Sequence, residues 1–265
     1  MSQAIPFALE RSLSTSEPWL VLSPHLDDAI LSCAALLEAQ AGNRKLIVAT
    51  LFTECSPGPH TRAAKSYLRQ CSAPDAPSLF AARRQEDADA LADLGASFHH
   101  LGAQDALFRR RDNRRIGSSV LSKTLPELVH RYPTYRFDIA LGRISRGDAD
   151  LVKELLAALS EIVEEDSPGL VFSPLAVGKH VDHLITRIVG CQLGPPVVFY
   201  SDFPYNQHHQ PDEGFLQSRK LMQWEWTQGL EVKQQWVHRY KTQVNAMFPS
   251  AKIPVAAEVY FAEGA

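Results

Sequence analysis

No uninterrupted apolar stretch of the 265-residue sequence approaches the ~20 residues that a membrane span requires, so we expect none. Residues 1–18 also lack a basic segment followed by an apolar core, which is the pattern of a signal peptide. The four cysteines show neither CxxC spacing nor a disulfide rhythm. In a chain of this length such cysteines are typically reduced, and we therefore expect a cytoplasmic protein.

A surplus of positive charge is missing as well, since 27 Lys and Arg residues stand against 30 Asp and Glu residues. The formal net charge of −3 argues against a nucleic-acid partner, because nucleic-acid binders usually carry a basic surplus. The one basic cluster runs from Arg109 to Arg111 and continues with Arg114 and Arg115. We interpret it as a solvated loop, with the binding of an anionic substrate group as the alternative.

What the sequence does contain is an apolar content of 45%, which is ample for a core. It has no internal repeat and no linker, so we expect one α/β domain over residues 1–265. Apolar runs and apolar residues at 3.6 spacing indicate the elements. The predicted strands are 19–22, 46–52, 98–101, 137–141, 170–173, 197–200 and 255–261, and the predicted helices are 29–41, 80–94, 118–131, 151–163, 216–223 and 231–247. Residues 53–78, which contain four prolines, are expected to form a loop or lid.

Side chains able to handle a metal ion and a proton follow the first predicted strand. His25 and Asp28 are three residues apart at the entry to a helix, so they can face one side, and Asp27 between them is free to point toward a water. One imidazole and one carboxylate make two thirds of an open catalytic zinc site, in which three protein ligands leave a fourth position for water. The third ligand must therefore come from elsewhere in the chain.

A second polar cluster, His180-Val-Asp-His183, follows another apolar run and precedes the helical residues 184–193. In parallel α/β sheets ligands bind outside the carboxyl ends of the strands, so two such turns can meet at one sheet edge. The first turn contains no G-x-G-x-x-G, and its two carboxylates would repel a pyrophosphate. These features exclude a dinucleotide-binding enzyme.

The two motifs Pro24-His-Leu-Asp-Asp28 and His180-Val-Asp-His183 resemble those of the LmbE-like (PIG-L) family of zinc-dependent N-deacetylases. Weaker motifs follow in the family's order: Arg83-Arg-Gln-Glu86 with Leu94-Gly95, Leu101-Gly-Ala-Gln-Asp105, and Lys233 with Tyr240-Lys-Thr-Gln243. The resemblance implies a Rossmann-like three-layer α/β sandwich with a mostly parallel sheet and a metal site at the carboxyl ends of the strands. It also implies removal of the acetyl group from an N-acetylglucosamine-type amino sugar or its conjugate.

The resemblance places the metal ligands at His25, Asp28 and His183. Neutral imidazole and ionised carboxylate suit Zn²⁺, and such a site can also accept Fe²⁺, Co²⁺ or Mn²⁺. Asp27 corresponds to the general base. A carboxylate suits this role, since Zn²⁺ lowers the pKa of bound water from about 15.7 towards ~7 and a nearby carboxylate can complete the deprotonation. The structural alternative is that Asp27 and Asp28 cap a helix and that both histidines are core residues.

Four further residues match family positions around the substrate. We expect His180 to donate a hydrogen bond to the oxyanion, and Asp182 to support a ligand imidazole from the outer coordination shell. Arg83 and Asp105 match positions associated with holding the sugar, since both side chains can bind hydroxyl groups. The alternative for Arg83 and Asp105 is a surface ion pair or a loop stabiliser.

The sequence departs from the commonest family pattern at Leu26, where proline is usual, and at Ala29, where glutamate is usual. Neither change removes a metal ligand, but substrate identity does not carry over across them. The alternative functions are a metal-dependent amidase acting on a thiol-sugar conjugate, a phosphoesterase, and a catalytically silent sugar-binding protein. The sequence leaves the oligomeric state open.

Overall fold

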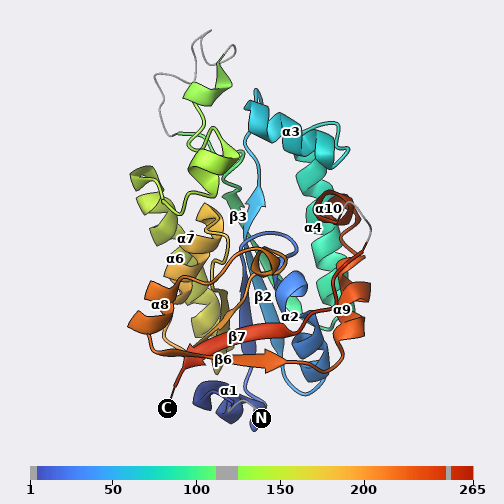
Figure 1. Ribbon diagram of the computed structural model, residues 1–265, viewed down its shortest axis with the longest axis vertical. Coiled ribbons are helices and arrows are strands. Elements are labelled where there is room, and N and C mark those ends of the chain that lie inside the picture. The colour runs from blue at the N-terminus through green and yellow to red at the C-terminus, as the bar shows by residue number, and fades with distance from the viewer. Residues whose placement is uncertain (1–4, 112–124, 249–251, 265) are drawn as a thin grey trace.

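The chain forms one seven-stranded sheet with helices on both faces, as seen in a computed structural model that describes residues 5–111, 125–248 and 252–264 (Figure 1). The strands are β1 Trp19–Ser23, β2 Leu46–Glu54, β3 Ser97–Gln104, β4 Leu170–Pro174, β5 Val197–Tyr200, β6 Leu221–Trp226 and β7 Glu258–Glu263. Their order across the sheet is β3-β2-β1-β4-β5-β7-β6. Strands β1 to β5 pair in parallel, and β7 is antiparallel to both β5 and β6. The predicted mostly parallel α/β fold is confirmed.

Two helical layers enclose this sheet (Figure 1). One layer holds α2 Asp28–Gln40, α4 Ala76–Asp93, α9 Leu230–Val237 and α10 Lys241–Met247, and the other holds α6 Ala149–Asp166, α7 Val181–Gly190 and α8 Glu213–Ser218. The short helix α1, Phe7–Leu13, lies at the lower end of the sheet, and α3, Arg62–Gln70, lies beyond the upper strand ends. Because both faces are covered, the central strands β1, β2 and β4 consist mostly of buried apolar residues instead of alternating with exposed polar ones.

The alternation of side chains along β1 shows how the core is divided. Trp19 and Val21 pack into the cluster under α2, whereas Leu20 and Leu22 pack into the cluster under α6 and α7. All four side chains are fully buried. Strand β1 pairs with β2 on one side and β4 on the other, which aligns the carboxyl ends of the three strands. This alignment positions the turns that carry the polar motifs.

The segment expected to be a loop or lid contains a helix. Strand β2 continues to Glu54, and α4 already begins at Ala76. Between them, the Thr61 hydroxyl caps α3 by accepting a hydrogen bond from Ala64 N at 3.1 Å. Residues 53–78 therefore add a helical wall above the strand ends in place of a plain loop (Figure 1).

Two predictions between residues 118 and 141 are wrong where the structure describes them. The predicted strand 137–141 is replaced by a π-helical turn, Tyr135–Ile139. The Asp138 carboxylate closes this turn by accepting hydrogen bonds from Thr134 N (2.9 Å) and Thr134 Oγ1 (2.5 Å). Of the predicted helix 118–131, residues 118–124 lie outside the described residues, and Pro126–Leu128 forms a single 3₁₀ turn.

The C-terminal predictions also need correction. The predicted helix 216–223 is wrong beyond Ser218, because residues 221–226 form β6 and pair along their whole length with β7. The predicted helix 231–247 is interrupted at Tyr240, whose buried hydroxyl donates to Asp87 Oδ1 at 2.9 Å. The strand expected at 255–261 is β7, which spans Glu258–Glu263 and lies between β5 and β6 in the sheet.

Two further features of the structure concern the cysteines and the lengths of the helices. All four cysteines are free, and Cys33 is buried in the core. Among the helices that the structure describes, none is long and apolar enough to cross a membrane.

Candidate active site

The two polar motifs lie side by side because β1 and β4 are neighbours in the sheet. After β1 the chain turns over His25 and enters α2 at Asp28. Ser23 holds this turn, since its hydroxyl donates to the His25 carbonyl (2.6 Å) and accepts from Ala29 N (3.0 Å). After β4 the chain enters α7, which carries His183 in its first turn. The topology thus brings both histidines to one sheet edge.

The three residues predicted as metal ligands converge there. Asp28 Oδ2 lies 3.1 Å from His25 Nδ1 and 3.4 Å from His183 Nε2. One potential ligand atom of each residue lies within 4.8 Å of the other two. The His183 Nε2 atom is buried and has no hydrogen-bond partner among the described residues. A buried nitrogen without a partner is costly, and a bound cation would satisfy it, so the set fits a metal ion, and two imidazoles with one carboxylate suit Zn²⁺.

Each of these histidines contacts a further carboxylate through its other ring nitrogen. His25 Nε2 lies 3.2 Å from Asp182 Oδ2, and His183 Nδ1 lies 2.6 Å from Asp202 Oδ1. Such contacts fix the tautomer and the orientation of a ligating imidazole. The sequence predicts Asp182 in this role. The sequence analysis gives no such role to Asp202. The position of Asp202 just beyond the predicted strand 197–200 is the signal that could have identified it.

Asp182 is held by the basic cluster that we expected to be solvated. Arg109 NH2 donates to Asp182 Oδ1, and Arg109 NH1 donates to Asp148 Oδ2 at 3.0 Å. Ala106 N donates to the other Asp182 oxygen at 2.8 Å. The Arg109 side chain is only 6% exposed, so the interpretation as a solvated loop is wrong for this residue. Arg114 and Arg115 lie outside the described residues.

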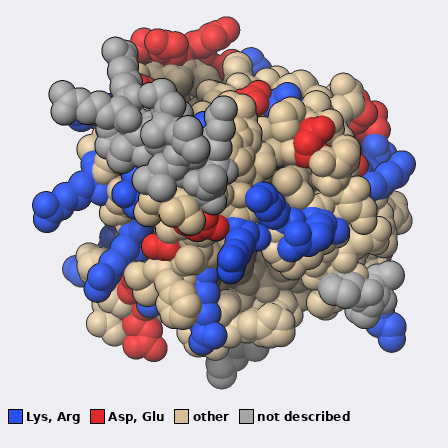
Figure 2. Space-filling model, turned by 90° about the horizontal axis from the view of Figure 1, so that it is seen from above, with Lys and Arg blue, Asp and Glu red and all other residues tan. Residues whose placement is uncertain are grey.

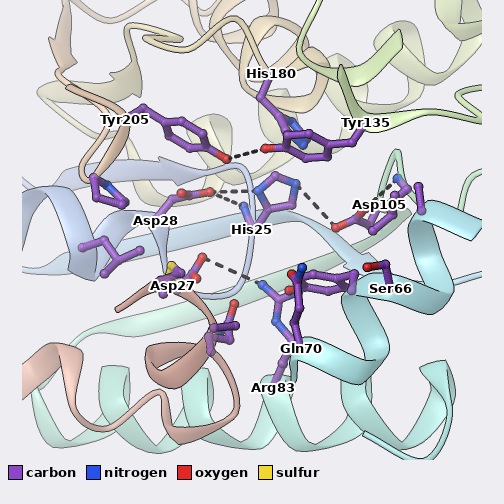
Figure 3. Close-up of a pocket in the computed structure, with 18 residues that line it drawn as sticks. His25, Asp27, Asp28, Ser66, Gln70, Arg83, Asp105, Tyr135, His180 and Tyr205 are labelled. Atoms are coloured by element: carbon purple, nitrogen blue, oxygen red, sulfur yellow. Dashed lines mark hydrogen bonds and ion pairs between the residues drawn. The ribbon is translucent and has the colours of Figure 1, made fainter. Parts of the chain in front are cut away.

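Asp27 points away from Asp28, toward Arg83 (Figure 3). Its Oδ1 atom lies 3.9 Å from Arg83 NH2, and both side chains are buried. Burial raises the pKa of Asp27 to about 7, the negative charge of Asp28 adds to this rise, and the Arg83 guanidinium opposes it. A carboxyl group with a pKa near neutrality can both accept and return a proton. The alternative that Asp27 caps α2 is not supported, since its side chain accepts no capping hydrogen bond.

His180 lines the same pocket as a neutral donor. Its Nδ1 atom accepts a hydrogen bond from Asp182 N at 3.2 Å, which leaves the proton on Nε2. Burial lowers the pKa of His180 well below its ordinary value, and the neighbouring His25 lowers it further. Ligand atoms of His25, His180 and Asp182 also lie within 4.8 Å of one another, but Arg109 already neutralises the Asp182 carboxylate. The first set is therefore the better suited of the two to hold a metal ion.

Arg83 and Asp105 complete the floor of the pocket. Arg83 NH1 donates to the Tyr67 hydroxyl at 3.1 Å. Asp105 accepts a hydrogen bond from Leu107 N at 2.8 Å, and its other oxygen lies 3.7 Å from His25 Nε2. Both side chains are buried and line the pocket, so the alternative of a surface ion pair is wrong.

The pocket has a volume of about 600 Å³, and Figure 3 shows its lining residues. The hydroxyls of Tyr135 and Tyr205 meet at 3.3 Å and close one side of it (Figure 3). The Tyr205 ring packs edge-on against His183, with the ring centroids 5.5 Å apart. Gly178 permits this packing, because a Cβ atom at that position would lie 2.7 Å from Tyr205 Cδ1.

The PIG-L family, described as GlcNAc-PI de-N-acetylase, matches residues 20–193 of the chain. The chain belongs to this family. It is 30% identical over 250 residues to the 2'-N-acetylparomamine deacetylase of Niallia circulans, covering 87% of this chain and 82% of that protein. It is also 28% identical to the 2'-N-acetylparomamine deacetylase of Streptomyces fradiae, over 70% of this chain and 57% of that protein. The sequence-based resemblance is confirmed, and with it the class of hydrolytic deacetylase.

A solved structure supports the fold independently. The deacetylase–teicoplanin complex from the biosynthesis pathway of teicoplanin superposes with a TM-score of 0.69 at 24% identity. The similarity covers 92% of this chain and 97% of the other. The expected Rossmann-like α/β architecture is therefore confirmed over nearly the whole chain.

Proposed function

We propose that this PIG-L family member removes the N-acetyl group from an acetamido sugar that is part of a larger conjugate, with Asp27 as the general base. The observation that carries the proposal is the placement of Asp27. Its buried carboxyl group lies beside the convergent His25, Asp28 and His183, and opposite Arg83, in one pocket. The relatives named above act on 2'-N-acetylparomamine, an acetylated amino-sugar compound, which supports this substrate class.

His25, Asp28 and His183 would hold the metal ion, which when bound supplies Lewis acidity that lowers the pKa of water and polarises the amide carbonyl. Asp27 accepts the proton of the attacking water. Its pKa of about 7 lets it then deliver that proton to the departing amine near neutral pH. Arg83 holds the Asp27 carboxylate in place from the opposite side of the pocket.

His180 is suited to stabilise the oxyanion that develops on the acetyl carbonyl oxygen. Its position on the pocket wall and its neutral state leave the Nε2–H group free to donate, with the ring held edge-on to His25 at 5.0 Å. Arg83 and Asp105 then bind sugar hydroxyls, since they offer a donor fork and an acceptor at the pocket floor.

Metal content and acetate release measured together test this proposal. We expect about one zinc ion per chain. We also expect acetate from N-acetylglucosamine conjugates, with kcat reduced about 10²–10⁴-fold in Asp27→Asn at unchanged metal content. Asp89→Asn, the same change at an exposed position of α4, is the control and should keep full activity.

Other products would change the assignment. Release of phosphate or of an amine without acetate would indicate the phosphoesterase or the thiol-conjugate amidase. Equal sugar affinity in the wild type and in Asp27→Asn, with no turnover in either, would indicate a silent sugar-binding protein.

A further inference from the structure

Three buried nitrogen atoms outside the active pocket lack a hydrogen-bond partner. They are His60 Nδ1, Arg110 Nε and His130 Nε2, and within the described part of the chain nothing pairs with them. The His60 and His130 rings have centroids 6.3 Å apart, and Arg110 Nη2 donates to the Pro59 carbonyl oxygen at 3.4 Å. Arg110 and His130 also form an isolated β-bridge. We call His60, Arg110 and His130 the His60 cluster.

The His60 cluster lies behind one wall of the active pocket. None of its three residues lines that pocket. The His60 ring packs edge-on against Phe108 at 5.2 Å, and Phe108 in turn contacts Tyr67, a lining residue, at 6.4 Å. His130 is fully buried, whereas His60 and Arg110 are partly exposed. The cluster is therefore separate from the site of the proposed reaction, and its outer side chains reach solvent.

The polarity of two of the three nitrogen atoms is fixed. Arg110 Nε carries a hydrogen and can only donate. His130 Nδ1 lies 2.8 Å from the Pro126 carbonyl oxygen, which only accepts, so the proton of the neutral ring is on Nδ1 and Nε2 is an acceptor. Burial lowers the pKa of His130 against the opposing contact with Pro126, which keeps the ring neutral near pH 7. The cluster thus offers a cationic donor beside a neutral acceptor.

The charges around the cluster favour an anion over a cation. Burial lowers the pKa of His60, and the positive charges of Arg110 and Lys65 lower it further. Lys65 and Arg62 are exposed on α3, and Figure 2 shows Lys and Arg side chains on this upper face. Glu127 offsets part of this charge, since its Oε1 atom accepts a hydrogen bond from Arg62 N at 3.2 Å. These three cationic side chains outnumber Glu127 and attract anions.

A metal ion does not suit the His60 cluster. Each group of three potential metal ligands found among the described residues lies in the active site, so the imidazoles of His60 and His130 have no third ligand beside them. The guanidinium of Arg110 would also repel a cation.

We propose that the His60 cluster binds hydrogen phosphate, as the free ion or as the end of a phosphate monoester. The hydroxyl of the phosphate donates to His130 Nε2, and its oxygens accept from Arg110 Nε and from His60 Nδ1 in the tautomer that carries the proton there. All three nitrogen atoms then gain the partners that buried polar groups require. Sulfate has the same shape but no hydroxyl, so one of its oxygens would face the acceptor of His130 without a proton between them.

Calorimetric titration of the full chain near pH 7, with inorganic phosphate and sulfate at equal ionic strength, tests the proposal. We expect saturable binding of phosphate and at least about tenfold weaker binding of sulfate, because a site built to pair with a hydroxyl rejects the analogue that lacks it. Titration with phenyl phosphate distinguishes the two sources, since comparable affinity indicates a monoester and much weaker binding indicates the free ion. Absence of saturable phosphate binding, or equal affinity for sulfate, would overturn the proposal.

Variants assign the binding to the cluster. Arg110→Met and His60→Phe each remove one donor and should weaken phosphate binding about tenfold or more. Arg143→Met removes an exposed arginine outside the cluster and should bind phosphate as the wild type does. Unchanged affinity in both Arg110→Met and His60→Phe would place the anion elsewhere and refute the assignment.

Nuclear magnetic resonance of the wild type with ¹⁵N-labelled histidine gives a readout that needs no folded variant. Phosphate should shift the ring nitrogen resonances of His60 and His130, whereas those of the exposed His238 should stay in place. Shifts confined to His25 and His183 would locate the phosphate in the active site and contradict the proposal.

Discussion

Asp202 Oδ1 lies 2.6 Å from His183 Nδ1, and Asp202 Oδ2 accepts a hydrogen bond from Val177 N at 2.8 Å. Asp202 follows β5, His183 belongs to α7, and Val177 lies in the loop between β4 and α7. The carboxylate thus ties the carboxyl ends of two neighbouring strands to one imidazole. It leaves His183 Nε2 pointing at Asp28, which is the orientation that a metal ligand requires.

Replacing Asp202 by Asn should weaken zinc binding about 10–100-fold, because the amide is a poorer acceptor for the His183 Nδ1 proton. Competition with a chelator measures the affinity. Asp150→Asn, at a side chain that is 85% exposed, is the control and should bind zinc as the wild type does. Wild-type affinity in Asp202→Asn would show that Asp202 does not orient the ligand.

Arg109→Met should lower the free energy of unfolding by about 3–5 kcal/mol, since it leaves buried carboxylates without their shared guanidinium. Asp182 loses its ion-pair partner, whereas Asp148 keeps Arg131, whose Nε lies 3.1 Å away. Urea denaturation checks the value. Arg11→Met, at a side chain 64% exposed, should change stability by less than about 0.5 kcal/mol. A similarly small effect in Arg109→Met would contradict a role for the buried ion pairs.

Gly178→Ala should reduce both stability and catalysis. Gly178 has a φ of +84°, which costs about 1–2 kcal/mol in a residue with a Cβ atom, and the new methyl group would displace Tyr205. Gly229→Ala is a matched control, because Gly229 has a φ of +63° and open space around it. By thermal denaturation we expect a larger stability loss in Gly178→Ala than in Gly229→Ala, because only the first must also move Tyr205, and we expect a lower kcat in Gly178→Ala alone. Equal kcat values would show that the Tyr205 position does not matter for turnover.

His130 should make the fold sensitive to mild acid. It is fully buried, its Nδ1 atom lies 2.8 Å from the Pro126 carbonyl oxygen, and its Nε2 atom has no partner among the described residues. Burial lowers the pKa of His130, so the unfolded chain binds a proton near pH 6.5 that the folded chain does not. Stability therefore falls as the pH drops below about 6.5, by up to ~1.4 kcal/mol per pH unit for this group.

Urea denaturation between pH 7 and pH 5 tests the contribution of His130. His130→Gln removes the titrating group, and its stability should fall less steeply with acid than that of the wild type, whatever its stability at pH 7. His238→Gln, at an exposed histidine of the α9–α10 connection, should retain the wild-type slope. An unchanged slope in His130→Gln would assign the acid sensitivity to other groups.

The sequence by itself was sufficient where a residue's position depends on its neighbours along the chain, as in the strand-to-helix turns. His25, Asp27 and Asp28 follow a buried strand and enter a helix, and residue type and spacing there predicted two candidate ligands, whereas the family resemblance supplied His183 as the third. The C-terminal strands were different. Residues 221–226 carry no strong strand signal, and six pairings with β7 decide their conformation.

Only the tertiary structure decided which distant groups complete the site. Arg109 reads as a surface residue in its basic run, yet Asp182 and Asp148 neutralise it in the interior. Asp202 and Tyr135 act across long sequence separations that no local pattern encodes. The pairing of β1 with β4 underlies these contacts, since it brings segments about 150 residues apart to one sheet edge. Spacing along the chain determines local geometry, whereas burial and counter-charges depend on what the fold places opposite each side chain.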